Sequence, residues 1–260
     1  MIEIRGIGKT FHSGTRSTTA LAPVDLGIAD GEFVSFIGPS GCGKSTLLNL
    51  VAGIVAPTCG SILHDGRSVS GPNTATGYMT QQDSLLPWRT AAANIALPLL
   101  LRGTPKAAIA GRVEAMLALV GLKNFGGHFP GELSGGMKKR VALAQILSYD
   151  PATLLMDEPF GALDAQLKLL MQAELMRIWE GARKTIIFVT HDLAEAITMA
   201  DRVVVFSSRP GSIKAVHAID LPRPRDPLKI QFDPAYRVIH QTLWDLLAPE
   251  IEASRAEAFA

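Results

Sequence analysis

The chain has 260 residues, of which 47% are hydrophobic and 19% are charged, and its formal net charge is +1. This composition excludes a disordered chain, and the balanced charge gives no overall indication of a nucleic-acid partner. The two cysteines, Cys42 and Cys59, stand in no metal-ligand spacing, which argues against a disulfide scaffold and fits a reducing compartment.

Neither the N-terminal segment nor the longest apolar run indicates a membrane span. The N-terminal segment MIEIRGIGKTF lacks the apolar core of a signal peptide. The longest apolar run, Thr90–Leu101, contains Pro98 and is shorter than the roughly 20 residues that a spanning helix requires. We therefore expect a chain that does not cross a membrane by itself, although a partner could hold it on one.

Short runs of β-branched and aromatic residues predict buried strands. Residues 1–30 are expected to add strands before the first of these runs. The runs are Phe33–Gly38, Thr153–Asp157, Thr185–Thr190 and Arg202–Ser207. Because they are continuously apolar, they suit a sheet that is covered on both faces.

Helical patterns alternate with these strands. One follows Gly38, and a longer one follows the second run and is predicted to stop at Gly181. The apolar face of the longer helix is predicted to consist of Leu163, Leu167, Leu170, Met171, Leu175 and Ile178. The alternation predicts an α/β fold with a mostly parallel core sheet.

Two further segments lie outside this alternation. Between Tyr78 and Thr153 the sequence is mainly helical and too long for an ordinary crossover, so we predict an inserted helical subdomain at about residues 86–150. Residues 221–227, LPRPRDP, are predicted to be a polar, proline-rich linker. A short helix is expected after it, with Asp233 as its cap and Pro234 in its first turn.

The first motif with chemical meaning is GPSGCGKST, Gly38–Thr46, which matches G-x-x-x-x-G-K-[ST] between a predicted strand and a predicted helix. Glycines let backbone N–H groups surround phosphates, and a helix N-terminus favours negative charge. Lys44 is predicted to reach the terminal phosphates of a nucleotide, and Ser45 to offer its hydroxyl to magnesium.

The second motif is TLLMDEPFGALD, in which an apolar strand ends in Asp157 and Glu158. Carboxylates at the buried end of a strand are costly unless they face a cation or water. Beside a P-loop, Asp157 is predicted to hold magnesium and Glu158 to polarise an attacking water. The alternative is an acidic strand end that caps the next helix.

His191 and Gln81 are two further candidates. His191 follows a predicted strand, at the edge where open sheets bind ligands, so we favour a γ-phosphate contact over a structural role. Asp192 and Glu195 are predicted to cap the helix after it. Gln81 could coordinate magnesium or water, or be an ordinary solvated loop residue. Leu85–Trp88, LLPW, is either a partner surface or packs against the helical insert.

A second glycine-rich helix start occurs in GELSGGMKKRVALAQ, where Gly135 and Gly136 stand together. Glycine destabilises a helix, so a pair at this point indicates a close approach of the backbone to another group.

Over roughly Ile2–Leu221, these elements resemble the ATP-binding subunit of an ABC transporter. The matching elements, in order, are an aromatic residue (Phe11), Walker A (Gly38–Thr46), the Q-loop (Gln81), the signature LSGGMKKR (Leu133–Arg140), Walker B (Leu154–Glu158), the D-loop GALD (Gly161–Asp164) and the switch histidine (His191). The resemblance implies a P-loop ABC ATPase fold with an N-terminal antiparallel β region. It also implies an ATPase domain at 1–221 and a C-terminal linker and short helix at 222–260.

The resemblance also implies ATP and Mg²⁺ as ligands and a role for each motif. Phe11 would stack on adenine, and Gln81 would link the nucleotide to the helical insert, where a permease docks. Two subunits would stack head to tail, so that Ser134, Gly135 and Gly136 of one close on the nucleotide of the other. Asp164 would also act across that dimer. The P-loop residues implied in nucleotide binding are Gly38, Pro39, Ser40, Gly41, Cys42, Gly43, Lys44, Ser45 and Thr46. Magnesium would be held by Ser45, Gln81 and Asp157, and catalysis would rest on Glu158, His191, Gln81 and Lys44.

Within this family the chain is similar to the nitrate, sulfonate and taurine importers. The shared pieces are GEFVSFIGPSGCGKSTLLNLVAGI, LLPW, DEPFGALDAQ and the ending SSRPGSI…LPRPRD. The resemblance implies a bacterial importer of a small anion, bicarbonate included. The partners implied are a second ATPase subunit (identical or a paralogue), two transmembrane permease subunits and, indirectly, a substrate-binding protein. The chain would lie on the cytoplasmic face of the inner membrane, with no nucleic-acid partner.

Three residues depart from the family pattern, and three other functions stay open. Lys138 and Lys139 stand where Arg-Gln is common, and Gln145 stands where an arginine is common, which could alter packing in the dimer or the insert. The alternatives are the ATPase of an exporter or lipid-handling system, a soluble ABC ATPase of translation or DNA repair, and a P-loop regulator or kinase.

Overall fold

A six-stranded sheet forms the centre of the molecule. The computed structural model describes residues 1–14, 16–82, 84–161 and 163–258. The strand order is β10-β9-β3-β8-β7-β6, and each neighbouring pair is parallel except β10 with β9. The strands are β3 (Phe33–Ile37), β6 (Thr76–Met79), β7 (Thr153–Asp157), β8 (Thr185–Val189), β9 (Arg202–Phe206) and β10 (Ile213–Ala218). The four buried runs predicted as strands are therefore confirmed, three of them ending one residue earlier.

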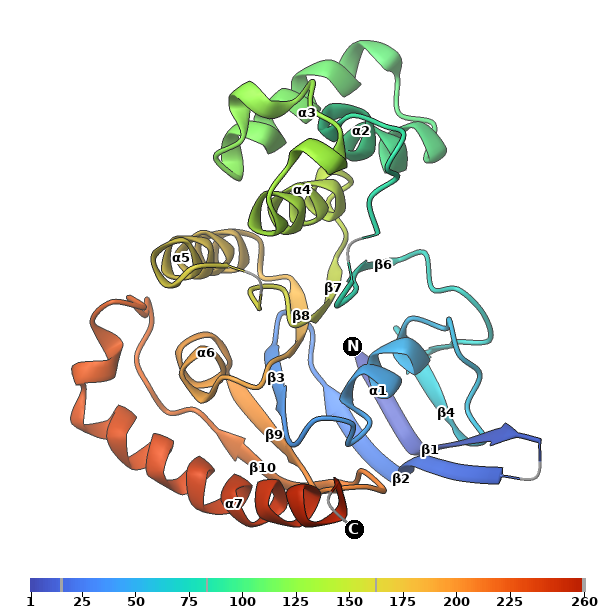
Figure 1. Ribbon diagram of the computed structural model, residues 1–260, viewed down its shortest axis with the longest axis vertical. Helices are drawn as coiled ribbons and strands as arrows, with labels where there is room; N and C mark the ends of the chain where they lie inside the picture. Colours follow the sequence, from blue (N-terminus) through green and yellow to red (C-terminus); the bar gives the residue numbers. More distant parts are fainter. Residues whose placement is uncertain (15, 83, 162, 259–260) are drawn as a thin grey trace.

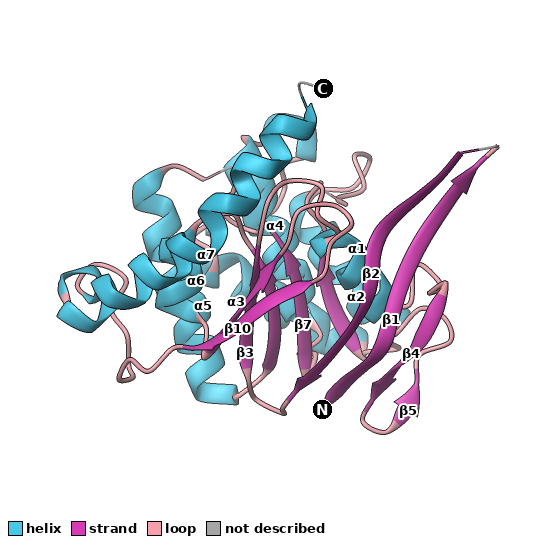
Figure 2. Cartoon of the chain, turned by 90° about the horizontal axis from the view of Figure 1, so that it is seen from below, coloured by secondary structure: helices cyan, strands magenta, loops and turns pink. Residues whose placement is uncertain are grey.

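A second, antiparallel sheet is built by the N-terminal part of the chain. Its order is β2-β1-β4-β5, with the long strands β1 (Ile2–Ser13) and β2 (Arg16–Ile28) followed by β4 (Cys59–His64) and β5 (Arg67–Ser68). Figure 2 shows this sheet on one side of the parallel strands and several helices on the other. The additional N-terminal strands expected from the sequence are present.

The helices fall into groups that Figure 1 separates clearly. The helices α2, α3 and α4 stand together at the upper end, while α5, α6 and α7 lie along one side of the parallel sheet. The bounds are α1 (Lys44–Val51), α2 (Ala91–Leu101), α3 (Lys106–Leu119), α4 (Gly135–Ser148), α5 (Ala165–Ala182), α6 (Leu193–Met199) and α7 (Pro234–Ala258). Single 3₁₀ turns lie at Lys123–Phe125, Pro130–Glu132 and Ile230–Phe232. The predicted helical insert therefore consists of real helices, while its boundaries stay a prediction.

Two apolar cores share the parallel strands because successive side chains of a strand point to opposite faces. Phe33 packs with α5, α6 and α7 in one core, whereas the next residue, Val34, packs with α1 and the antiparallel sheet in the other. All residues of β3, β7 and β8 are buried. This double covering explains why these strands are continuously apolar in the sequence.

Helix α5 differs from its prediction in two respects. Leu170 is 67% exposed, although it was predicted on the buried face. The buried stripe follows Met171, Leu175 and Trp179 at intervals of four residues, and Leu170 lies about 100° away from it around the helix. The helix also continues through Gly181 to its last residue, Ala182. Arg183 follows as the C-terminal cap and has a φ of 46°.

The C-terminal part of the chain is more ordered than predicted. Helix α7 has 25 residues, so the prediction of a short helix was wrong. The segment 221–227 is not a free linker, since Arg225 is only 5% exposed. Its guanidinium donates hydrogen bonds to the carbonyls of Ile197, Thr198, Ala200, Ile219 and Leu221. Burial, followed by the nearby charge of Arg223, lowers the pKa of Arg225 to about 10. Within the described ranges, no helix has both the length and the hydropathy of a membrane span.

Candidate functional site

The P-loop joins β3 to α1 and takes a backbone shape that glycine permits. Gly41 and Gly43 have φ angles of 75° and 97°, in the region that other residues rarely adopt. A Cβ atom at Gly43 would lie 2.6 Å from the carbonyl oxygen of Ala20. Lys44 is 7% exposed, and its ammonium donates hydrogen bonds of 2.8 Å to the carbonyls of Gly38 and Pro39. The predicted phosphate loop is thus folded, with its lysine held over the loop.

A cavity of about 470 Å³ opens beside this loop. It brings together residues that are far apart in the sequence, including Phe11 of β1, Gln81 after β6 and Glu158 after β7. Its lining consists of Phe11, Thr18, Ala20, Ser40, Gly41, Gly43, Lys44, Ser45, Thr46, Gln81, Glu158, Val189 and Arg209. The sequence did not indicate Thr18, Ala20, Val189 or Arg209 as site residues. The only signal for Arg209 was its place in SSRPGSI, which gave no hint of where that segment lies.

Asp157 is the last residue of β7 and carries an uncompensated oxygen. Its side chain is buried, and among the described residues its Oδ1 has no hydrogen-bond partner. Burial raises the pKa of Asp157, while a hydrogen bond with Ser45 acts in the opposite direction. A buried carboxylate oxygen next to a hydroxyl is a ligand set that suits a hard divalent cation.

The protein alone does not complete a metal site there. Within the described part of the chain, no three His, Cys, Asp or Glu side chains gather closely enough to hold a metal ion. Magnesium is usually held by one or two carboxylates together with phosphate oxygens and water. Asp157 and Ser45 therefore fit a magnesium ion that arrives with a nucleotide.

Glu158 follows directly and lies between two other predicted residues. His191 Nδ1 is 3.4 Å from Glu158 Oε1, and Gln81 Nε2 donates a 3.4 Å hydrogen bond to Oε2. Glu158 has a φ of 49°, a strained backbone conformation for a residue other than glycine. Since β7 and β8 are adjacent and parallel, with Asp157 opposite Val189, their carboxyl ends place Glu158 beside His191. The structure thus brings Gln81, Glu158 and His191 together.

The signature segment, Leu133–Arg140, does not line the cavity at the P-loop in the described part of the chain. Ser134 caps α4, and its hydroxyl accepts a hydrogen bond of 3.3 Å from the N–H of Met137. Ser134 and Gly135 are exposed, and neither is among the described residues that line the cavity at Lys44. Asp164 caps α5 in the same way, accepting from the N–H of Leu167 at 3.0 Å. Ala162 of the predicted D-loop lies outside the described residues. These helix starts are therefore free to meet a group from another molecule.

Two of the departures from the family pattern have identifiable contacts. Lys139 is buried, and its ammonium donates to the backbone carbonyls of Thr80 and Gln81. Gln145 donates a 2.9 Å hydrogen bond to the carbonyl of Asn94, joining α4 to α2. Both residues therefore act in packing of the helical subdomain and of the loop that carries Gln81.

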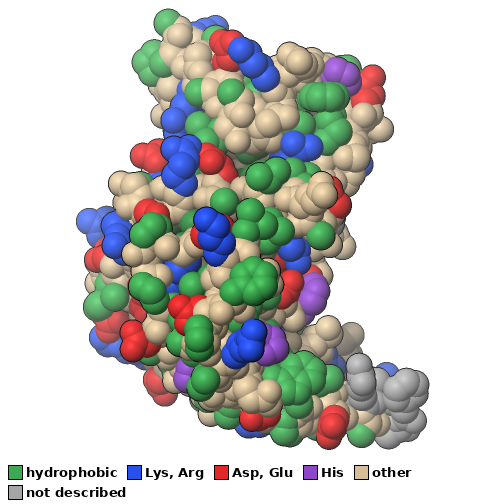
Figure 3. Space-filling model, turned by 90° about the vertical axis from the view of Figure 1, so that its left-hand side faces the viewer, with side chains coloured by type: hydrophobic (Ala, Val, Ile, Leu, Met, Phe, Trp, Pro, Cys, Tyr) green, Lys and Arg blue, Asp and Glu red, His purple; other side chains and the backbone are tan. Residues whose placement is uncertain are grey.

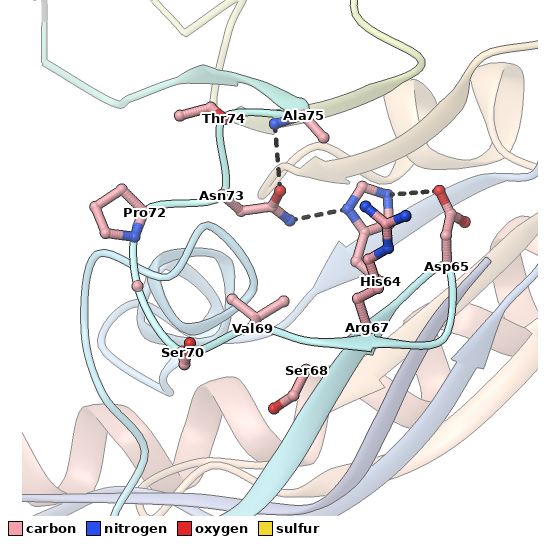
Figure 4. A pocket seen from close by; sticks show the side chains of 11 residues that line it. His64, Asp65, Arg67, Ser68, Val69, Ser70, Pro72, Asn73, Thr74 and Ala75 are labelled. Atoms are coloured by element: carbon pink, nitrogen blue, oxygen red, sulfur yellow. Dashed lines mark hydrogen bonds and ion pairs between the residues drawn. The ribbon is translucent and has the colours of Figure 1, made fainter.

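A larger cavity, of about 670 Å³, lies away from all of these motifs (Figure 4). His64 lies beside it, but both of its ring nitrogens are engaged. Asn73 Nδ2 is 2.9 Å from Nδ1, and Thr153 Oγ1 is 3.2 Å from Nε2. His64, Asp65 and Arg67 line this cavity, but none of the motif residues named above does, so the smaller cavity at the P-loop is the candidate site.

The chain is similar to several known proteins. The family described as ABC transporter matches residues 21–161. The nitrate import ATP-binding protein of a Synechocystis species is 45% identical over 221 residues, 85% of this chain and 83% of that protein. The aliphatic sulfonates import ATP-binding protein of Bacillus cereus is 42% identical over 224 residues, 86% of this chain and 88% of that protein.

Two further matches extend the picture. The bicarbonate transport ATP-binding protein of Synechococcus elongatus is 44% identical over 239 residues, 90% of this chain but 36% of that protein. Among solved structures, a dimeric post-hydrolysis state of the ATP-binding cassette MJ0796, bound to ADP and Pi, superposes with a TM-score of 0.79 at 31% identity. The match covers 85% of this chain and 100% of that structure.

Proposed function

Because the chain belongs to the ABC transporter family as an ATP-binding subunit, we propose that it hydrolyses ATP to drive the import of a small anion through a separate permease. The family resemblance and the P-loop ABC ATPase fold inferred from the sequence are confirmed. Nitrate, sulfonates and bicarbonate are the substrates named for the relatives, and they define the class proposed here.

The main support for the proposal is that Lys44, Glu158 and Asp157 lie in one region of the structure. The cavity at the P-loop contains Lys44 and Glu158, and at the adjacent strand end lies Asp157, whose Oδ1 has no partner among the described residues. The P-loop N–H groups and Lys44 bind the phosphates. Asp157 and Ser45 would hold Mg²⁺, which would neutralise phosphate charge when bound. Gln81 is proposed as a third oxygen ligand or as a contact to water.

Hydrolysis is proposed to depend on Glu158 and His191. Glu158 accepts the proton of the attacking water, and the hydrogen bond from Gln81 orients its carboxylate. His191, 3.4 Å from Glu158, steadies the γ-phosphate and the water. Phe11 lines the same cavity and stacks on adenine. In the two-subunit state, Ser134 and Asp164 of one subunit act at the nucleotide of the other.

The permease contact is proposed for the helical subdomain. A groove of about 730 Å³ between α2 and α3 is lined mainly by small and apolar side chains, among them Ala96, Ile109 and Val113. Trp88 is 69% exposed near the start of α2, whereas Leu85 is buried. Within the LLPW segment, Leu85 therefore packs in the interior and Trp88 lies on the surface. Figure 3 shows hydrophobic side chains on the surface of the upper lobe, which is the lobe formed by α2, α3 and α4 in Figure 1.

Uptake by the native host tests the proposal. A chromosomal Glu158→Gln variant is compared with wild type for labelled nitrate, taurine, an alkanesulfonate and bicarbonate. Loss of uptake of one anion supports the importer function and names the substrate. Unchanged uptake of all four contradicts the small-anion class and favours another solute or an exporter. Recovery of the chain in the membrane pellet with its co-expressed permease is expected in either case and would exclude a soluble function.

A further inference from the structure

The turn between β9 and β10 packs against the P-loop. Gly211 accepts a 2.8 Å hydrogen bond from Ala22 N–H and donates one of 3.3 Å to the carbonyl of Ala20. A Cβ atom at Gly211 would lie 1.6 Å from the carbonyl oxygen of Cys42, so only glycine fits this contact. The turn comprises residues 207–212 and lies next to the loop that binds phosphate.

Arg209 extends from this turn into the nucleotide cavity. Its Nη2 donates a 3.3 Å hydrogen bond to the carbonyl of Gly41, and its side chain lines the cavity together with Lys44. A guanidinium has five N–H donors, and among the described residues the bond to Gly41 uses one of them. The remaining donors suit phosphate oxygens, which arginine binds in a bidentate manner.

The outer side of the turn is held by α7. Glu250 Oε2 accepts a 2.7 Å hydrogen bond from the N–H of Ser208, and Oε1 pairs with Lys214 at 2.8 Å. Ser207 and Ser212 close the turn internally, with their hydroxyl oxygens 2.9 Å apart. The turn is therefore fixed both by the P-loop and by the C-terminal helix, which keeps Arg209 at the cavity.

We propose that Arg209 is a second cationic ligand of the nucleotide's phosphate chain, and that Glu250 is a positioning residue that holds the turn for it. The proposal rests on the proposed nucleotide site at the P-loop. Of the charged side chains that line the cavity, Lys44 and Arg209 are positive and Glu158 is negative. The phosphate chain of ATP carries more negative charge than Lys44 alone neutralises, and Arg209 supplies a further positive charge beside Gly41.

Equilibrium binding of a non-hydrolysable ATP analogue, ADP and adenosine to the full chain tests Arg209. Arg209→Ala and Arg209→Gln are expected to weaken binding of the analogue and ADP by about 10-fold or more, because a charge-assisted hydrogen bond is lost. Arg209→Lys should bind within about 3-fold of wild type, since it keeps the charge, and adenosine binding should not change. The difference between wild type and Arg209→Gln should shrink as salt rises. Arg237→Ala, on the exposed side of α7, is the matched control.

Three results would overturn the role of Arg209. Glutamine can still donate to Gly41, so wild-type affinity of Arg209→Gln with weak binding of Arg209→Ala would mean that Arg209 only braces the P-loop. Wild-type affinity of both variants would mean no role, and an equal loss for adenosine would place the contact on the nucleoside. A separate result, normal binding by Lys44→Ala, would contradict the nucleotide site itself.

A double-mutant cycle tests the positioning role of Glu250. Glu250→Ala should weaken binding of the analogue about 3-fold in the wild-type chain and have no further effect in Arg209→Gln, because both changes remove the same contact. Thermal melting of each variant distinguishes weaker binding caused by lost positioning from weaker binding caused by loss of folding. Equal effects of Glu250→Ala in the two backgrounds would show that Glu250 acts on stability alone.

Discussion

Replacing Asp157 by Asn should stabilise the ligand-free protein while it abolishes magnesium-dependent nucleotide binding. The wild-type carboxylate is buried, and its Oδ1 has no partner among the described residues. An unsatisfied buried group of this kind costs about 1–3 kcal/mol. Because Asn is uncharged, it removes the cost of burying a charged carboxylate while it keeps a polar oxygen in the same place, so we expect a gain of about 1–2 kcal/mol in the free energy of unfolding. For a chain of this size that gain raises the melting temperature by roughly 2–8 °C.

The gain should depend on pH in a defined direction. Burial raises the folded-state pKa of Asp157 above its ordinary value of 3.8, so the folded protein binds this proton more tightly than the unfolded chain. The stability of wild type therefore falls as pH rises from about 4 through the folded-state pKa, and the loss is complete above it. Asp157→Asn should melt like wild type near pH 3 and above wild type at pH 7.

Thermal melting with and without ligand measures both effects. Saturating Mg-ATP should raise the stability of wild type by about 2.7 kcal/mol at 100 times the Kd and leave Asp157→Asn almost unshifted. Asp220→Asn, an exposed carboxylate, is the control and should behave as wild type in both conditions. A ligand-free Asp157→Asn protein that melts below wild type at pH 7 would refute the idea that this oxygen is a net cost. A full Mg-ATP shift in the variant would refute its role at the metal.

Three further predictions concern catalysis, assembly and folding. Glu158→Gln should keep nucleotide affinity but lower the rate of hydrolysis by roughly 100- to 10,000-fold and accumulate an ATP-bound dimer in gel filtration; normal turnover would remove Glu158 as the base. Ser134→Arg should prevent dimerisation while each monomer binds ATP normally, and an intact ATP-dependent dimer would contradict the signature contact. Arg225→Met leaves several buried carbonyls without donors, so it should lower stability by at least about 3 kcal/mol and the melting temperature by more than roughly 6 °C. A melting temperature within 2 °C of wild type would show that water replaces the guanidinium.

The parts of the candidate site that the sequence indicates most directly are those with a local physical signature. A phosphate loop needs a strand, glycines and a helix start in one segment, and a carboxylate at a strand end follows directly from the buried strand before it. The meeting of Glu158 with His191 was also predictable, because carboxyl ends of neighbouring parallel strands converge.

The residues that were missed depend on contacts between distant segments. Arg209 belongs to a turn whose sequence is that of an ordinary hairpin. Its position at the P-loop is evident only from two contacts, the hydrogen bond of Arg209 to Gly41 and the packing of Gly211 on Cys42. Arg225 was assigned to a linker because its neighbours are prolines, yet the carbonyls that bury it come from α6 and the segments around it. Leu170 was misplaced because one step along a helix turns a side chain by about 100°, enough to move it from the core to solvent.

The contacts of Lys139 have a consequence for how the chain can diverge. Its ammonium binds the carbonyls of residues 80 and 81, which every amino acid provides, rather than their side chains. Side chains in this loop can therefore change without loss of the tie to α4. Lys139 thus holds the main chain of this loop in position relative to α4, while the side chains of the loop are free to vary.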